Sequence, residues 1–174
     1  MVLSLGLLGA TMLVLTTSLD QENRTSNRVT ANDSVTVALE RITREIRQAT
    51  YVAAPTGGGS TLVLHEYVNS TSSTPDTIAW NCGNPSGAQY YCTRTDGAGA
   101  PVTEVTNLTT SNVFSQGSLP VDSSNSSTAA IYAPITVTLS QAIPSSTNLL
   151  LSEVVIPRNC QYKNDGYNQS CDGS

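Results

Sequence analysis

The sequence is poor in cationic side chains and in histidine. It contains 8 Lys and Arg against 13 Asp and Glu, for a net charge of -5, and one histidine, His65. The low number of cations argues against a nucleic-acid partner, because phosphate binding requires a clustered basic surface. Histidine-based acid–base catalysis would depend on His65 alone, and the adjacent Glu66 would point to the opposite face of a strand. Neither nucleic-acid binding nor histidine-based catalysis is therefore expected.

Motifs that carry catalysis or hold a cofactor are also missing. There is no G-x-S-x-G, no H-E-x-x-H and no glycine-rich phosphate loop before a helix. The glycine run at 57–59 follows a predicted helix, so it acts as a helix terminator. Without Cys-x-x-Cys, and with the one histidine far from the cysteines, a zinc site is not expected. We therefore expect a protein that is not an enzyme and has no cofactor.

The four cysteines form two closely spaced pairs, Cys82 with Cys92 and Cys160 with Cys171. Four cysteines allow three pairings, of which two local loops are the simplest. Each disulfide would contribute about 2–4 kcal/mol, and only in an oxidising compartment. The abundance of Thr, Ser, Asn and Gly, with 12% charged residues, is likewise typical of proteins outside the cytoplasm.

Two weaker predictions concern polar loops. Among the Asn-x-Ser/Thr sequons, Asn69 and Asn125 are candidate glycan acceptors, although chance explains most sequons in so Asn-, Ser- and Thr-rich a chain. Near the C-terminus, Asn164, Asp165 and Asp172 could bind calcium through oxygen ligands in a disulfide-closed loop. The loop lacks the alternating acids of a dedicated calcium site, so the interpretation that it binds no metal ion is favoured.

The longest apolar run lies at the N-terminus, where Met1 to Leu19 contain no charged residue. As a helix this run would be about 28 Å long, close to the thickness of a bilayer core. A signal peptide would need basic residues before the run, and a buried helix would need walls on all sides. A membrane helix is favoured. Its apolar residues are Val2, Leu3, Leu5, Leu7, Leu8, Met12, Leu13 and Leu15.

The same helix is expected to continue through a solvated stalk, 16–34, into an amphipathic segment, 35–54. Apolar residues at intervals of four, three, four and three predict a stripe that packs on a sheet. These residues are Val35, Leu39, Ile42, Ile46 and Ala49. The charged residues between them, Glu40, Arg41, Arg44, Glu45 and Arg47, are predicted to form a solvated or salt-bridged face. The helix should stop near Ala54, because Pro55 and glycines follow.

The remainder of the chain, residues 60–174, is predicted to form strands and loops. A first strand is expected at 61–68, and a hairpin at 76–94 with its turn at 83–88 and a Cys82–Cys92 disulfide at its base. A weaker, edge-like strand follows at 102–108, a half-buried strand at 130–140 and an apolar, central strand at 149–157. The expected fold is α+β: a membrane helix and stalk, 1–34, and a head, 35–174, built from the helix end and an antiparallel sheet. Trp80 is expected in its core.

Two segments carry a family resemblance. Residues 39–49 read LERITREIRQA, and residues 2–15 read VLSLGLLGATMLVL. The first is similar to the helix end of the larger, minor members of the type IV pilin and type II secretion pseudopilin family, and the second resembles the family's membrane helix. The prepilin peptidase site, Gly followed by Phe-Thr-Leu-x-Glu, has no counterpart in residues 1–6, MVLSLG. Either the chain starts at an internal methionine of such a helix or it is an aberrant member of the family, and the first alternative is favoured.

The resemblance implies a structural role. The chain would be a subunit of a type IV pilus or pseudopilus, held in the cytoplasmic membrane by residues 1–19 and then extracted into a cell-surface filament. Its partners would be other copies or related pilin subunits, packed through their N-terminal helices. The alternative is a membrane-tethered or secreted surface module, such as an adhesin, in which the head binds a ligand and the helix serves only as a tether.

Overall fold

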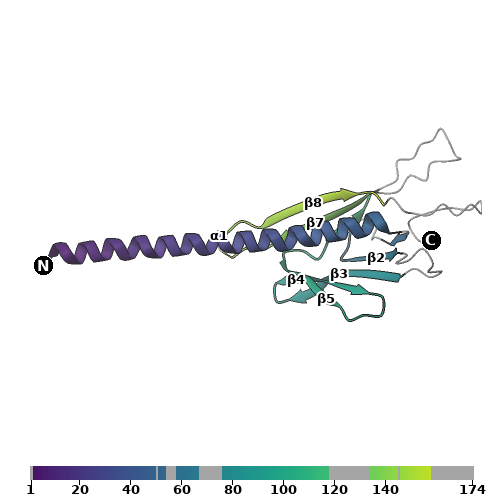
Figure 1. Cartoon of the computed structure of the whole chain (residues 1–174), viewed down its shortest axis with the longest axis horizontal. Helices are drawn as coiled ribbons and strands as arrows, with labels where there is room; N and C mark the ends of the chain where they lie inside the picture. The colour runs from purple at the N-terminus through teal and green to yellow at the C-terminus, as the bar shows by residue number, and fades with distance from the viewer. Residues whose placement is uncertain are drawn as a thin grey trace, which may run out of the picture.

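A computed structural model gives the fold as one long helix carrying an antiparallel sheet (Figure 1). It describes residues 2–49, 51–53, 58–66, 76–117, 134–144 and 146–157, with only the backbone for 2–11, 13 and 51. The helix α1 spans Val2–Gln48. The predicted α+β class, with a long N-terminal helix packed on an antiparallel sheet, is confirmed.

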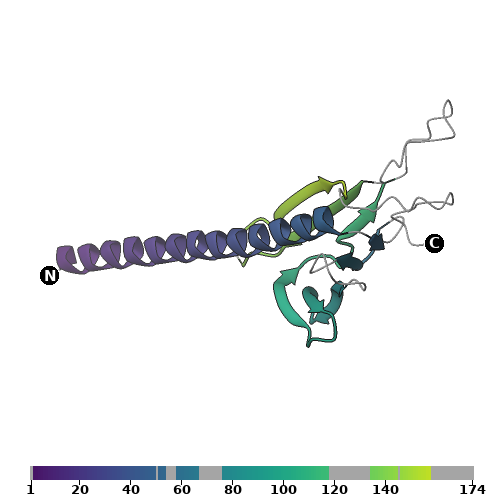
Figure 2. The same cartoon turned by 45° about the vertical axis from the view of Figure 1, so that its right-hand side comes forward.

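The described sheet has eight strands, every pairing of which is antiparallel. The path runs β1-β2-β3-β4-β5-β7-β6, and β8 pairs with β7. In Figure 1 and Figure 2 the sheet curves around the C-terminal part of α1, with β7 and β8 on one side and β2 to β5 on the other. The strands are β1 (Tyr51–Ala53), β2 (Thr61–Glu66), β3 (Asp76–Ser86), β4 (Gln89–Asp96), β5 (Val102–Leu108), β6 (Phe114–Gln116), β7 (Ile135–Gln141) and β8 (Leu149–Val155).

The apolar stripe of α1 forms the centre of the core. All five of its predicted residues are buried, and the stripe also includes Ala38. They pack in one cluster with large buried side chains of the sheet, including Trp80 and Phe114. Burying a Val, Leu or Ile side chain contributes about 1.5–3 kcal/mol, so this stripe is the main attachment of the helix to the sheet. The stripe residues are Val35, Leu39, Ile42, Ile46 and Ala49.

The predicted end of the helix near Ala54 is wrong, because α1 ends at Gln48. Residues 51–53 form strand β1, in which Val52 lies opposite Leu64 of β2. Val52 is buried, and the ladder to β2 supplies partners for its backbone groups. Pairing of β1 with the next strand, β2, therefore takes the place of the last predicted turns of the helix.

The disulfide between Cys82 and Cys92 is confirmed, with an S–S distance of 2.00 Å. Its predicted position at the base of the hairpin is wrong. Strand β3 extends through most of the predicted turn, as far as Ser86. The chain reverses at Gly87 and Ala88, where Gly87 takes the positive φ of 64° that glycine tolerates. The disulfide therefore crosses the middle of a long hairpin, at an irregularity in the pairing beside Asn81.

The predicted sheet positions of three later strands have different outcomes. Strand β7 is half-buried with strict alternation, as predicted. Strand β8, predicted to be central, pairs only with β7 among the described strands, and its Leu150 and Val154 are exposed. Strand β5, predicted to be edge-like, has β4 on one side and touches β7 through the single pair Leu108 and Gln141. Apolar content alone thus misplaced β8, since an edge strand can carry apolar residues on its outer face.

Candidate functional site at the helix–sheet junction

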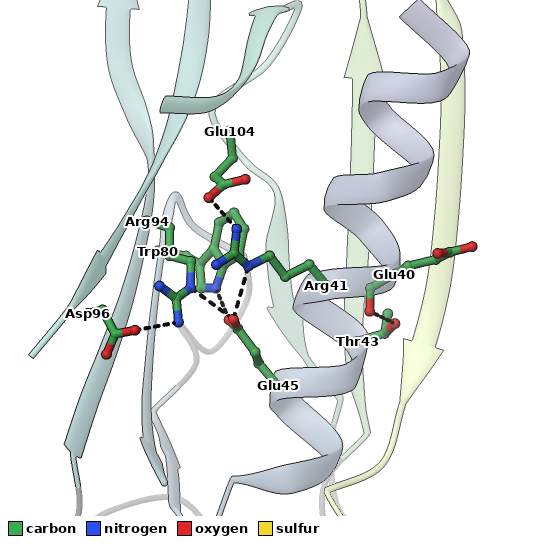
Figure 3. Close-up of polar contacts among 8 residues, drawn as sticks. All are labelled: Glu40, Arg41, Thr43, Glu45, Trp80, Arg94, Asp96 and Glu104. Atoms are coloured by element: carbon green, nitrogen blue, oxygen red, sulfur yellow. Dashed lines mark hydrogen bonds and ion pairs between the residues drawn. The ribbon is translucent and has the colours of Figure 1, made fainter. Parts of the chain in front are cut away.

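Glu45 of α1 is a buried carboxylate, only 7% exposed. Of the two predicted alternatives for the charged residues of this helix, a solvated or a salt-bridged face, Glu45 follows the second, with Arg41 and Arg94 as partners. Its Oε2 accepts a hydrogen bond of 2.7 Å from Nε1 of Trp80. Its Oε1 accepts one of 2.8 Å from Nε of Arg94 and one of 3.3 Å from Nε of Arg41 (Figure 3). Three elements, α1, β3 and β4, therefore meet at one side chain.

The sequence positions of these residues explain why they converge. Glu45 follows Ile42 by three residues and precedes Ala49 by four, so it lies along the buried stripe of the helix. Trp80 and Arg94 each lie two positions from a cysteine of the Cys82–Cys92 disulfide. Residues two apart on a strand share a face, so both side chains point toward the helix.

The network continues to two further acids. Arg41 Nη1 lies 2.6 Å from Glu104 Oε1, and Arg94 Nη2 lies 3.0 Å from Asp96 Oδ2. Burial by itself would lower the pKa of Arg94, but the hydrogen bond and attraction of Glu45, followed by those of Asp96, raise it above the ordinary value. The guanidinium therefore stays charged. A buried carboxylate is tolerated here because each oxygen has a donor.

This arrangement holds the sheet on the helix, and the hydrogen-bonding capacity of Glu45 is largely used within the protein. Both carboxylate oxygens of Glu45 are already occupied by protein donors. The described residues also contain no group of three or more His, Cys, Asp or Glu arranged to bind a metal ion. A separate ion pair, between Arg47 and Glu153 of β8 at 2.8 Å, is partly exposed to solvent and contributes about 1 kcal/mol or less.

Glu66, on β2, makes the stability of the fold depend on pH. Burial first, then repulsion by Glu45 and Asp96, raise its pKa, while Arg94 opposes them. A carboxyl whose folded-state pKa is raised stabilises the fold below its unfolded pKa, and this contribution is lost as pH rises through the folded value. We expect Glu66→Gln to stabilise the protein at pH 7 and to have less effect at pH 4.

Urea denaturation of the wild-type protein and of Glu66→Gln at pH 4 and pH 7 measures the difference in the free energy of unfolding. Glu40→Gln, which replaces an exposed acid on α1, is the control. An equal effect of Glu66→Gln at pH 4 and pH 7 would contradict the pH dependence.

Several predicted site residues lie outside the described part of the chain. They are Cys160 and Cys171, the sequons at Asn69 and Asn125, and the calcium candidates Asn164, Asp165 and Asp172. His65 is described: it lies on β2, with its Nδ1 3.4 Å from Thr77 Oγ1. The prediction of Trp80 in the core is right, since only 1% of it is exposed.

The projecting half of α1 (residues 2–23) is the other distinctive feature, and it extends well beyond the sheet (Figure 1). Met12, Val14, Leu15 and Leu19 are all more than half exposed. Of the predicted membrane or filament-core residues, Met12 and Leu15 are thus exposed. The side chains of Val2, Leu3, Leu5, Leu7, Leu8 and Leu13 lie outside the described residues.

Within the described residues, no helix combines the length and the apolarity that crossing a membrane requires.

The sequence pattern did not indicate that Glu45 is buried, nor that Arg94 and Glu104 belong to the same network. A signal existed for Glu45 and Arg94, because Glu45 lies between Ile42 and Ala49 on the apolar side of the helix and Arg94 lies two residues from Cys92. Glu104 has no such signal, because its strand does not alternate regularly. Comparison of the chain with protein-family models, curated proteins and solved structures finds no match.

Proposed function

We propose that this chain is a structural subunit of a pilus-like filament at the cell surface. In this proposal the projecting halves of α1 from many copies pack together as the filament core, and the heads form its outer surface. The observation that carries the proposal is the projecting half itself, a long helical segment with large apolar side chains exposed to solvent. Such a surface on a helix commonly marks an interaction site.

The pattern of the exposed side chains supports helix packing. Met12, Leu15 and Leu19 follow one another at intervals of three and four, so they line one face of α1. A second helix against this face would approach to about 8–10 Å between axes. Each apolar side chain buried in that contact would contribute about 1.5–3 kcal/mol, which favours assembly over solvent exposure.

The contacts between the C-terminal part of α1 and the sheet also support a role as a filament subunit. A filament subunit must transmit force between its core helix and its head. Glu45 connects α1 to β3 and β4, and the apolar stripe around Ile42 and Ile46 is fully buried. Helix and sheet would therefore move as one body, as load transfer along a filament requires.

Before assembly, residues 1–19 would rest in the cytoplasmic membrane with the head outside, as the family resemblance implies. Transfer from lipid into a core of helices keeps apolar side chains out of water in both states. The step then avoids the penalty of about 25 cal/mol per Å² for exposing apolar surface.

Fibres sheared from producing cells should contain this chain, and Leu15→Glu with Leu19→Glu should reduce their yield by at least about tenfold, because buried, unpaired carboxylates oppose helix packing. Immunoblotting and electron microscopy of the sheared fraction measure this. The control, Thr17→Glu with Gln21→Glu, adds the same charges with the same spacing at exposed positions on the opposite side of α1. Recovery of the wild-type chain only as dispersed membrane monomers would contradict the proposal and favour a tethered binding module.

A further inference from the structure

A groove of about 550 Å³ lies where α1 leaves the head, between the helix and the segment that leads into β8. Five of its lining residues belong to two turns of α1, and two come from the other wall. The groove thus lies next to the projecting half of the helix. Its lining residues are Arg24, Thr25, Arg28, Val29, Asn32, Ser146 and Leu149.

The groove combines positive charge with apolar surface. Among the described residues, Arg24 and Arg28 take part in no ion pair, although acids outnumber cations in the chain. Val29 is 54% exposed and Leu149 is partly buried on the opposite wall. A fitting occupant would present a carboxylate beside apolar side chains.

The projecting half of the same helix has such a face. Leu15, Leu19 and Glu22 follow one another at intervals of four and three, so two apolar side chains and one acid share one exposed face. Glu22 and Arg28 are six residues apart, which places them about a third of a turn from one another around α1. The acidic-apolar face ends at Glu22 and the lining of the groove begins at Arg24, so the two surfaces occupy successive stretches of one helix.

We propose that the groove receives α1 of a second copy of this chain, with the incoming Glu22 paired to Arg28 and the incoming Leu19 packed on the Thr25–Val29 floor. Six residues of helix then set an axial offset of about 9 Å between neighbouring copies. This inference rests on the proposed filament function and names the contact between its subunits.

The contact joins two different surfaces, so it does not close on itself. The incoming copy keeps its own groove open, and a third copy can occupy it in the same way. Repetition of one heterologous contact gives a filament with a constant step. Charge pairing at Arg28 fixes the register, because apolar packing along a helix tolerates sliding more readily than a misplaced charge.

A charge swap tests this contact in the full-length protein. Glu22→Arg and Arg28→Glu, made singly, should each reduce the yield of sheared fibres by about tenfold, since each places like charges together. The double variant, Glu22→Arg with Arg28→Glu, should restore the yield because opposite charges face each other again. Glu40→Arg, an exposed acid on α1 outside both surfaces, serves as the control and should leave the yield unchanged.

Oxidative cross-linking gives a second readout that does not need fibres. A chain carrying both Glu22→Cys and Arg28→Cys should form a ladder of cross-linked multimers in membranes or fibres, whereas Glu22→Cys with Arg44→Cys should not. Normal fibre yield in both single charge variants, or no rescue by the swap, would overturn the groove contact and leave the filament function standing. If the wild-type chain forms no fibres but the double-cysteine variant still gives the predicted ladder of multimers, the filament function is overturned and the groove contact is supported.

Discussion

Replacing Glu45 with alanine should lower the free energy of unfolding by about 3–5 kcal/mol, the usual cost of removing one partner from a buried ion pair. The substitution leaves the indole N–H of Trp80 without its acceptor and separates Arg94 from its nearest buried carboxylate. Arg94 retains Asp96, and Arg41 retains Glu104, so the loss falls mainly on the groups nearest the core. Urea denaturation followed by circular dichroism measures the change.

Glu40→Ala is the matched control for this substitution. Glu40 lies on the same helix, but Figure 3 shows its side chain pointing away from the network, and it is exposed. Its replacement should change the free energy of unfolding by no more than about 0.5 kcal/mol. Equal effects of Glu45→Ala and Glu40→Ala would show that the buried network does not hold the sheet on the helix.

Trp80→Ala should be at least as damaging, with a loss of about 3–5 kcal/mol from the cavity left by the largest side chain in the core. Trp80 packs in the same cluster as Ile42 and Ile46 of the helix stripe and lies two residues from the disulfide, so the cavity would open between helix and hairpin. The surrounding disulfide-linked hairpin restricts the collapse that would fill it. Chemical denaturation again measures the effect.

Trp80→Phe separates packing from hydrogen bonding at this position. Phenylalanine keeps much of the apolar volume but has no N–H, so Oε2 of Glu45 loses the donor it has in the wild-type protein. The expected loss is about 1–3 kcal/mol, smaller than that of Trp80→Ala. A phenylalanine variant as unstable as the alanine variant would assign the whole effect to the hydrogen bond and contradict the packing argument.

The predictable part of this fold is the part governed by local patterns. The stripe from Val35 to Ala49 could be read from spacing, because a helix that borders a core must repeat its apolar residues every three or four positions. The Cys82–Cys92 disulfide could be read from the short separation and the strand-like residues on either side. Strand β7 could be read from strict alternation.

The unpredicted part depends on partners that local sequence patterns do not reveal. Glu45 meets residues 35 and 49 positions away, and a charged residue on a helix is taken as exposed unless its partners are known. The end of α1 depends on pairing between β1 and β2, which no local propensity encodes. The edge position of β8 likewise depends on which strands are present beside it, and the apolar content of 149–157 carries no information about that.

The position of Trp80 has a consequence for spectroscopy. It is the only tryptophan in the chain, and its indole contacts the carboxylate that connects α1 to the sheet. Its fluorescence therefore reports on a single place, the interface between helix and head. Water reaching the indole would shift the emission to longer wavelength when the helix separates from the sheet, even while the disulfide-linked hairpin stays folded. The native protein thus contains its own optical reporter of the state of the junction.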